Sequence, residues 1–362
     1  MTLEAAMDRA MELARNGYGR VSPNPLVGCV ILQGEEIIAE GWHDSFGGPH
    51  AEAHALSRLT HVPSDAVLVC TLEPCAHTGK TPPCADAIIA SGIRHVVVGT
   101  VDPNPVVAGR GIDRMRAAGV RVDVGVREAE CAWMNRFFLH SIRHRRPYCI
   151  LKVAQSIDGC VATATGESEW ITNEETRTRV HELRAGVDAV CVGSGTVRSD
   201  NPSLTVRLAQ GRNPLRLVLD SRLSLSAEMN VFSGDAQTIV FCTHEGFDEQ
   251  RASALRAQGV KVEQVDMNAG GMVDVSAAIQ CAYDAYGVQS ILFEAGSTLA
   301  SALVAASIPH ELHICIAPII IGDGQRAFGG LHTSALSDAP GFRLHSSQRI
   351  QDDTYMVFTK KM

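Results

Sequence analysis

The chain has 362 residues, of which 45% are hydrophobic and 20% charged, a balance typical of a globular protein with about two domains. Its formal net charge of −8 gives no electrostatic reason to expect nucleic acid or an anionic membrane as a partner. The 11 cysteines are odd in number and irregularly spaced, unlike a small secreted disulfide framework, so most should be reduced.

Residues 1–19 mix acidic and basic side chains at a helical period and have no continuous apolar core. They predict an amphipathic helix and not a signal peptide. No stretch approaches the roughly 18 to 20 uninterrupted apolar residues that a membrane span needs. We therefore expect a cytoplasmic protein.

An alternation of strands and helices follows this first helix. We expect a pair of strands, a helix, a strand, a second helix and another strand, in that order, at residues 26–43, 49–59, 65–75, 82–93 and 94–105. The strand pair turns near Gln33 and Gly34, Pro49 suits the first turn of its helix, and Gly92 ends the second helix. This alternation favours a layered α/β domain.

The pattern changes between Phe137 and Arg146, where basic residues cluster ahead of Pro147. We place a domain boundary there, which gives domains at 1–145 and 146–362. A second α/β series follows, with helices between several of its strands. Those strands are expected at residues 148–156, 189–195, 215–220, 238–242, 290–296 and 312–322.

The segment TLEPCAHTGKTPPC, residues 71–84, holds two cysteines that are candidates for a metal site. Zinc favours thiolate and imidazole ligands, and a catalytic zinc keeps one position for water. His50 is followed two residues later by Glu52, and an H-x-E element before P-C and a further cysteine is typical of zinc deaminases. Cys75 and Cys84 both lie at or near predicted helix N-termini, where the helix dipole favours a thiolate.

Two features leave this site open when residue spacing is considered alone. His54 lies one helical turn after His50, so either histidine or both could be ligands. The general deaminase signature is C-x-x-C, whereas eight residues separate Cys75 from Cys84. A closed structural zinc site, or no metal, therefore remains an alternative.

Four motifs in order resemble the bifunctional deaminase–reductase family of riboflavin biosynthesis: SPNPLVG (22–28), HAEAHAL (50–56), TLEPCAHTGKTPPC (71–84) and DPNP (102–105). The long spacer between the cysteines is that family's variant of the cytidine-deaminase-like fold. The resemblance covers nearly the whole chain. It implies an N-terminal cytidine-deaminase-like three-layer α/β domain and a C-terminal dihydrofolate-reductase-like α/β domain.

The resemblance also implies roles for residues of the first domain. His50, Cys75 and Cys84 would bind one zinc ion, and Glu52 would be the general acid and base of a hydrolytic deamination. The implied substrate is 2,5-diamino-6-ribosylamino-4(3H)-pyrimidinone 5′-phosphate. The substrate-binding residues would be Asn24 and His43 at the pyrimidine, and His77, Lys80, Asp102 and Asn104 near the ribosyl phosphate.

Plainer interpretations stand beside these roles. His43 could be a loop histidine and Lys80 a solvated side chain. His54, His61 and His95 are better explained as packing or surface histidines than as ligands.

The second domain lacks the G-x-G-x-x-G fingerprint of dinucleotide-binding folds, because Gly193 and Gly195 are followed by Arg198 at the third glycine position. Five other strings resemble the reductase half of the same family: KVAQSIDG, SEWIT, GSGTVRSDNPSLTVR, RLVLDS and FEAGSTLASAL. In the last of these a strand runs into a helix at Gly296. The amides of Gly296, Ser297 and Thr298 there suit a cofactor pyrophosphate, although a plain strand-to-helix turn is the alternative.

This resemblance implies reduction of the ribosyl chain to a ribityl chain by NADPH, giving 5-amino-6-(5-phosphoribitylamino)uracil. Lys152 and Asp200 are candidates for the proton donor. Arg207 has a forked guanidinium group that suits a phosphate. Arg184 could reach the same phosphate, although an arginine on a helix is more often solvated. The implied substrate-binding residues are Lys152, Ser168, Arg184, Leu204, Arg207 and Glu294. The implied NADPH-binding residues are Ala154, Trp170, Thr196, Asp200 and Ser221, beside the three amides above.

Two other classes of function remain alternatives. A nucleic-acid base deaminase with an accessory domain would need a basic surface, which the acidic balance does not favour. A non-catalytic interaction protein with a structural zinc would not require Glu52. We expect a small phosphorylated pyrimidine as partner, no nucleic acid or membrane, and a homo-oligomer, either dimer or tetramer.

Overall fold

The computed structural model describes residues 1–76, 82–105 and 107–361. The chain divides into two compact units, Met1–Arg145 and Arg146–Met362. The basic cluster at which the sequence predicts a boundary is helical, since α6 (Arg136–His144) is the last element of the first unit. None of the helices in these described ranges is long and apolar enough to cross a membrane.

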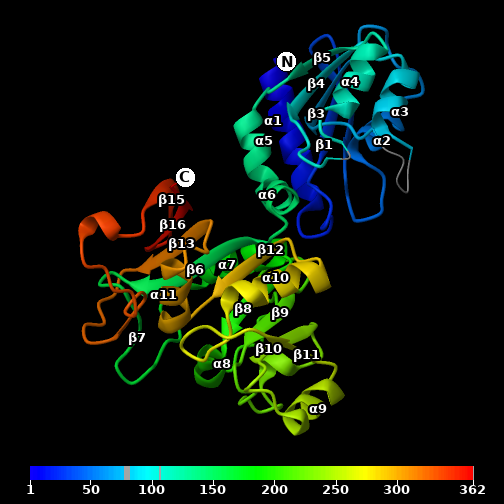
Figure 1. Ribbon diagram of the computed structural model, residues 1–362. Coiled ribbons are helices and arrows are strands. Elements are labelled where there is room, and N and C mark those ends of the chain that lie inside the picture. Colours follow the sequence, from blue (N-terminus) through cyan, green and yellow to red (C-terminus); the bar gives the residue numbers. More distant parts are fainter. Residues whose placement is uncertain (77–81, 106, 362) are drawn as a thin grey trace. The chain divides into compact units, whose positions relative to one another are not determined.

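A five-stranded sheet in the order β2-β1-β3-β4-β5 forms the centre of the first unit (Figure 1). β1 pairs antiparallel with β2 and β3, whereas β3, β4 and β5 are parallel. Gly34 lies between β1 and β2 with φ +57°, which confirms the predicted turn. The strands are β1 (Gly28–Gln33), β2 (Glu36–Trp42), β3 (Val67–Leu72), β4 (His95–Thr100) and β5 (Arg121–Val124).

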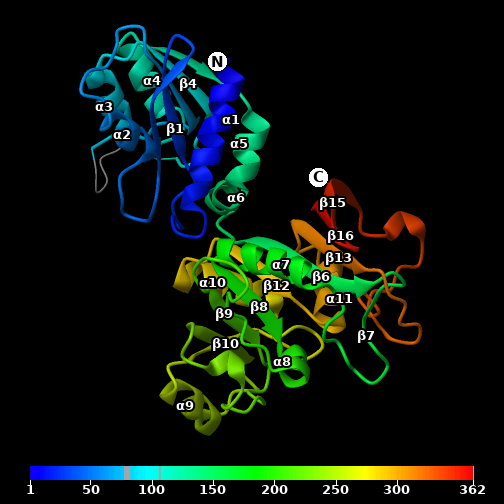
Figure 2. The same cartoon turned by 180° about the vertical axis from the view of Figure 1, so that it is seen from behind.

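Helices cover both faces of this sheet (Figures 1 and 2). One buried cluster joins α1 (Leu3–Ala14) and α5 (Glu128–Met134) to one face. A second cluster joins α2 (Ala51–Leu56), α3 (Cys84–Ser91) and α4 (Arg110–Ala117) to the other. The predicted three-layer α/β arrangement is therefore confirmed for this unit.

The second unit is built on a nine-stranded sheet in the order β11-β10-β9-β8-β12-β6-β13-β16-β15. The strands from β11 to β13 in this order are parallel, and β16 and β15 add an antiparallel pair at the β13 side. The strands are β6 (Tyr148–Ser156), β8 (Ala189–Gly193), β9 (Leu215–Leu219), β10 (Thr238–Thr243), β11 (Lys261–Val265), β12 (Ser290–Glu294), β13 (Glu311–Ala317), β15 (Phe342–Ile350) and β16 (Asp353–Lys360). A small separate sheet pairs β7 (Cys160–Ala162) with β14 (Gln325–Arg326).

The faces of the large sheet carry different helices. α10 (Val275–Tyr286) and α11 (Ser297–Ala305) pack on one face. α8 (Ser194–Asp200) and α9 (Glu249–Ala257) pack on the other, where Val180 of α7 (Glu174–Gly186) also meets β13 and β16. Because side chains alternate along a strand, Lys152 and Ala154 of β6 share the face covered by α7.

Candidate active sites

The three predicted metal ligands converge in the first unit. His50 immediately precedes α2, Cys75 lies in the loop after β3, and Cys84 is the first residue of α3. His50 Nδ1 is 3.2 Å from Cys84 Sγ and 3.6 Å from Cys75 Sγ, and the three ligand atoms lie within 4.8 Å of one another. In a tetrahedral zinc site, ordinary bond lengths place nitrogen and sulfur ligands roughly 3.5 Å apart. The donor types and their spacing therefore fit zinc.

His54 lies outside this cluster. Its Nδ1 is 3.1 Å from the Trp42 carbonyl oxygen, and its Nε2 is 3.2 Å from an Arg58 nitrogen. His50 is the N-cap residue of α2 and has an extended backbone, with φ −72° and ψ 158°. The His50 carbonyl oxygen accepts the His54 main-chain N–H at 2.9 Å, so the two residues lie one turn apart, but of the two only His50 joins the cysteines.

The two cysteines share the N-terminus of α3. The Cys84 main-chain N–H donates to Cys75 Sγ at 3.3 Å, so the Cys75 sulfur meets that helix end although Cys75 itself lies outside a helix. Hydrogen bonds from Cys84 and His50 hold the pKa of the Cys75 thiol well below its ordinary value. This environment favours the thiolate that a metal requires.

Glu52 is the second residue of α2, and only 3% of its surface is exposed. Burial raises the pKa of its carboxyl group to about 7. A carboxyl group with a pKa near neutrality can both accept and return a proton, which is what a general acid and base must do.

Asn24 and His43 form a hydrogen-bonded chain that ends beside His50. The Pro49 carbonyl oxygen lies 2.9 Å from His43 Nδ1 and can only accept, so Nδ1 carries the proton. His43 Nε2 then accepts from Asn24 Nδ2 at 3.0 Å. Burial lowers the pKa of His43, which favours this neutral form. Because both ring nitrogens are engaged, His43 orients Asn24 and the segment that leads to the metal ligand.

The residues predicted near the substrate phosphate are only partly described. His77 and Lys80 lie outside the described residues. Asp102 follows β4, and its carboxylate accepts the Asn104 main-chain N–H at 2.8 Å. The sequence motifs did not predict a role for Glu73, whose buried carboxylate binds the backbone of this same loop. A charged residue at the end of a buried apolar strand was the available signal, because such a group needs hydrogen-bond partners.

In the second unit, Lys152 and Glu294 lie opposite each other on β6 and β12. Lys152 Nζ is 3.6 Å from Glu294 Oε2, and Arg184 of α7 donates to Glu294 Oε1 from Nη2 at 2.7 Å and Nε at 2.9 Å. Burial opposes ionisation of Glu294, but Arg184 and Lys152 outweigh it and hold the pKa at about 2. The site therefore presents an ionised carboxylate between two cations.

Arg184 and Arg207 meet at Thr205. Arg184 Nη1 donates to the Thr205 carbonyl oxygen at 2.5 Å, and Arg207 Nη1 donates to the Thr205 hydroxyl at 3.0 Å. His181, which the sequence motifs did not single out, accepts the Arg207 main-chain N–H at 2.9 Å. Arg184 is buried and bonded to Glu294, whereas Arg207 is exposed and is the better placed of the two to meet an anion.

Leu204 differs in kind from the other predicted substrate residues. It has φ +54°, which is rare for a branched side chain, and its side chain is buried in the core beneath α8 and α9. Contact between this position and a substrate would therefore come from its backbone.

The predicted cofactor residues lie around α8 and α11. Asp200 at the end of α8 accepts from the Ser168 hydroxyl at 3.1 Å, so a predicted cofactor residue meets a predicted substrate residue. A Cβ atom added at Gly296 would lie 3.2 Å from Thr196 Oγ1, which places the N-terminus of α11 beside α8. Gly296 is the N-cap of α11, so the predicted strand-to-helix junction is confirmed.

Four further cofactor predictions have distinct surroundings. The Ser297 hydroxyl donates to the Arg326 carbonyl oxygen at 2.5 Å, while Thr298 beside it is exposed. Ser221 is buried, and its hydroxyl accepts the Val273 main-chain N–H at 2.9 Å. Trp170 is 63% exposed. The Arg177 guanidinium carbon lies over the Trp170 ring, 4.6 Å from the ring centre.

Two families match the two units. The "Cytidine and deoxycytidylate deaminase zinc-binding region" matches residues 1–100, and the "RibD C-terminal domain" matches residues 147–356.

The similarity to individual proteins extends over nearly the whole chain. The riboflavin biosynthesis protein RibD of Bacillus amyloliquefaciens is 38% identical over 359 residues, which cover 99% of this chain and 92% of that protein. RibD of Escherichia coli (strain K12) is 37% identical over 364 residues, which cover 97% of each.

Two solved structures are similar over 99% of both chains. The diaminohydroxyphosphoribosylaminopyrimidine deaminase/5-amino-6-(5-phosphoribosylamino)uracil reductase of Thermotoga maritima has a TM-score of 0.87 and 37% identity. RibD of Acinetobacter baumannii has a TM-score of 0.88 and 32% identity.

Proposed function

The chain belongs to the RibD family of riboflavin biosynthesis, and from this premise we propose how its residues carry out the two reactions. It is a bifunctional enzyme with a cytidine-deaminase-like zinc-binding domain and a RibD reductase domain. Family membership selects this function over a nucleic-acid base deaminase and over a non-catalytic zinc protein. The deaminase is assigned to residues 1–145 and the reductase to 146–362.

The deaminase site would hold zinc on His50, Cys75 and Cys84. The convergence of one imidazole and two sulfurs within 4.8 Å carries this assignment. Zinc bound there would act as a Lewis acid that lowers the pKa of water toward neutrality. Glu52 would take up the proton of the attacking water and deliver it to the departing ammonia, a role that its burial beside the cluster supports.

Substrate binding would begin at Asn24, which His43 orients toward the pyrimidine. The 5′-phosphate of 2,5-diamino-6-ribosylamino-4(3H)-pyrimidinone would lie near Asp102 and Asn104, with His77 and Lys80 of the cysteine spacer as its cationic partners. A cation in this spacer would offset the phosphate charge.

The reductase site would bind the deaminated product at Lys152, Ser168, Arg207 and Glu294, and at the Leu204 backbone. Arg184 would hold Glu294 in place. NADPH, bound near Ala154, Trp170, Thr196, Asp200, Ser221 and the N-terminus of α11, would supply hydride to C1′ of the ring-opened ribose. Of the two candidate proton donors we favour Lys152, whose ammonium group lies beside Glu294 on the sheet face.

Replacement of Glu52 by Gln tests the deaminase assignment. The amide keeps the size of the side chain but cannot accept a proton, so ammonia release should fall by at least about 100-fold. Zinc content and NADPH oxidation with deaminated substrate should stay at wild-type levels, because neither depends on this proton transfer. Ammonia release at the wild-type rate would overturn the assignment.

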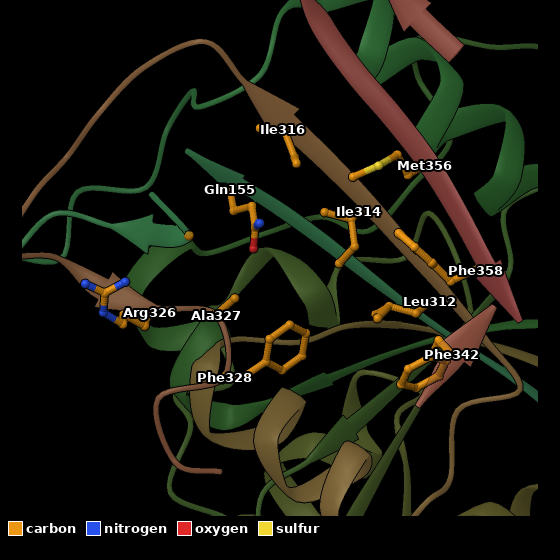
Figure 3. A pocket seen from close by; sticks show the side chains of 11 residues that line it. Gln155, Leu312, Ile314, Ile316, Arg326, Ala327, Phe328, Phe342, Met356 and Phe358 are labelled. Carbon is orange, nitrogen blue, oxygen red and sulfur yellow. The ribbon is translucent and has the colours of Figure 1, made fainter. Parts of the chain in front are cut away.

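We also propose that the enzyme is a homo-oligomer joined through the second unit. An apolar hollow of about 620 Å³ lies against β13 and β16 (Figure 3). Its lining residues Leu312 and Ile314 flank His313, the β13 partner of Lys152, so the hollow lies on the sheet face away from Lys152. Leu312, Ile314 and Phe358 point into it, and Phe342 at the start of β15 closes one side. A second copy of the chain is the proposed cover, because β15 is exposed along both of its faces.

Sedimentation velocity should show a dimer or tetramer, and Phe342→Asp should shift it toward monomer. A monomeric wild type would contradict the proposal.

A further inference from the structure

Glu73 connects the zinc-ligand segment with the loop that follows β4. It directly follows β3 and lies two residues before Cys75, and only 4% of its surface is exposed. Its main-chain N–H donates to the Thr100 carbonyl oxygen at 3.0 Å, which continues the pairing of β3 with β4. The backbone of Glu73 is thus held by the sheet.

Both carboxylate oxygens of Glu73 accept main-chain hydrogen bonds from the segment 102–112. Oε2 accepts from Gly109 at 2.9 Å and from Asp102 at 3.3 Å. Oε1 accepts from Gly111 at 3.0 Å and from Ile112 at 3.4 Å. The carboxylate therefore binds main-chain N–H groups at both ends of the connection between β4 and α4, at Asp102 and at Gly109–Ile112.

The same contacts tie α4 to the neighbours of Cys75. The first N–H groups of a helix have no partner within it, and a carboxylate at that end satisfies them and complements the helix dipole. A Cβ atom at Gly111 would lie 1.9 Å from the Pro74 carbonyl oxygen, so the helix approaches the backbone just before Cys75. Just after Cys75, the Ala76 carbonyl oxygen accepts from Arg114 of α4 at 3.2 Å.

We infer that Glu73 is a positioning residue of the deaminase, which fixes Asp102 on the phosphate side of the site relative to Cys75 on the metal side. This inference rests on the proposed function of Asp102 and Asn104 near the substrate phosphate. Asp102 in turn holds Asn104 through its carboxylate, so displacement of the Asp102 backbone moves both residues. Loss of the Glu73 carboxylate should therefore weaken binding of the phosphorylated substrate.

A purely structural role for Glu73 predicts a different kinetic result. If the carboxylate only stabilised α4, its loss would lower the melting temperature and the fraction of active, zinc-loaded protein. The kcat per total protein would then fall while the KM of the surviving enzyme stayed the same. The change in KM relative to the change in kcat therefore distinguishes a positioning role from a purely structural role.

The test is Glu73→Gln in the full chain, with ammonia release measured over a range of substrate concentration. The amide can accept with one oxygen only, so two of the four hydrogen bonds are lost, and we expect the deaminase KM to rise about tenfold or more. The kcat per bound zinc should change less than about threefold, and NADPH oxidation with deaminated substrate should be unchanged. An unchanged KM, with or without a lower melting temperature, would overturn the inference.

Two further variants make a negative result informative. Asp102→Ala should raise the same KM, because it removes the acceptor of the Asn104 N–H. If Asp102→Ala has no effect on KM, the proposed phosphate-side function fails; if it raises KM while Glu73→Gln does not, only the role of Glu73 fails. Asp123→Asn on β5 is the matched carboxylate-to-amide control, since its partners are the His95 and Arg121 side chains, and its KM should equal the wild-type value.

Discussion

Buried charged side chains with specific partners define both sites at the level of single residues. In the first unit, His50 clusters with Cys75 and Cys84, and the buried Glu52 carboxyl group interacts with all three. In the second, Glu294 is ionised between Arg184 and Lys152. A buried charge is costly unless it is paired, so each of these groups depends on its neighbours for its protonation state.

Arg184→Lys tests this dependence in the reductase. Lysine keeps the positive charge but cannot bond Glu294 and the Thr205 carbonyl oxygen together as the guanidinium does. We expect the catalytic efficiency of NADPH oxidation to fall by about 10- to 100-fold, since losing charged hydrogen bonds costs about 1.5–3 kcal/mol. Ammonia release by the same preparation is the control and should be unaffected; a reductase of wild-type efficiency would contradict the assigned role of Arg184.

At the level of elements, the strands that bury apolar side chains on both faces were predictable from sequence. β6, β8, β9, β10 and β12 are central parallel strands, and they appear as short apolar runs, as buried parallel strands do. β15 and β16 were not predicted. β15 is exposed along most of its length and its sequence is mainly polar, so its pairing with β16 depends on contacts between strands and not on a local pattern.

The candidate sites were predictable to a similar extent. Residue spacing alone left His50 and His54 open, the family resemblance implied His50 with Cys75 and Cys84, and the structure places His50 beside the two cysteines. Glu73 binds main-chain N–H groups, which every residue except proline has, so no side-chain motif could reveal its partners. His181 was missed for the same reason, because it accepts from the Arg207 backbone.

Helix α1 provides a test of packing at this scale. A Cβ atom at Gly28 of β1 would lie 1.8 Å from the Ala10 carbonyl oxygen, so α1 lies directly against the strand only because this residue is glycine. Gly28→Ala should lower the free energy of unfolding by about 1–3 kcal/mol through overpacking. Urea unfolding of the full chain measures this change. Gly234→Ala, where an added Cβ meets nothing within 4 Å, should behave like the wild type, and equal stability of both variants would contradict the close approach of α1.

Helix α7 should make stability depend on pH through His181. Burial, with Arg184 and Arg207 nearby, lowers the pKa of His181 from 6.5 to about 4 in the folded chain. Between these values the unfolded chain binds more protons, so acidification from pH 6.5 toward 4 should lower the free energy of unfolding. His181→Asn removes the titrating group and keeps a hydrogen-bond acceptor. The difference in melting temperature between pH 7.5 and pH 5 should therefore be smaller for this variant, and an equal difference would contradict the prediction.

At the level of the whole molecule, each unit contains its own complete set of proposed site residues. The deaminase residues all fall within Met1–Arg145 and the reductase residues within Arg146–Met362. Each half of the chain should therefore keep its activity when the site of the other half is inactivated.

Mixing two single-site variants tests this independence. Glu52→Gln should retain reductase activity only, and Lys152→Ala should retain deaminase activity only. Together they should oxidise NADPH when given the diaminopyrimidine phosphate, after a lag in which the deaminated intermediate accumulates. If each variant keeps its own half-reaction but the mixture oxidises no NADPH, the intermediate must stay within one molecule and the two sites are not independent.

The most direct measurement concerns the metal centre, because the deaminase assignment depends on it. Zinc content and ammonia release should be measured together for wild type and Cys75→Ser, with NADPH oxidation of deaminated substrate as the control for folding. We predict about one zinc per wild-type chain and, in the variant, loss of both zinc and ammonia release with reductase activity retained. Ammonia release at the wild-type rate from a variant that holds no zinc would contradict the assignment of His50, Cys75 and Cys84 as the catalytic metal site.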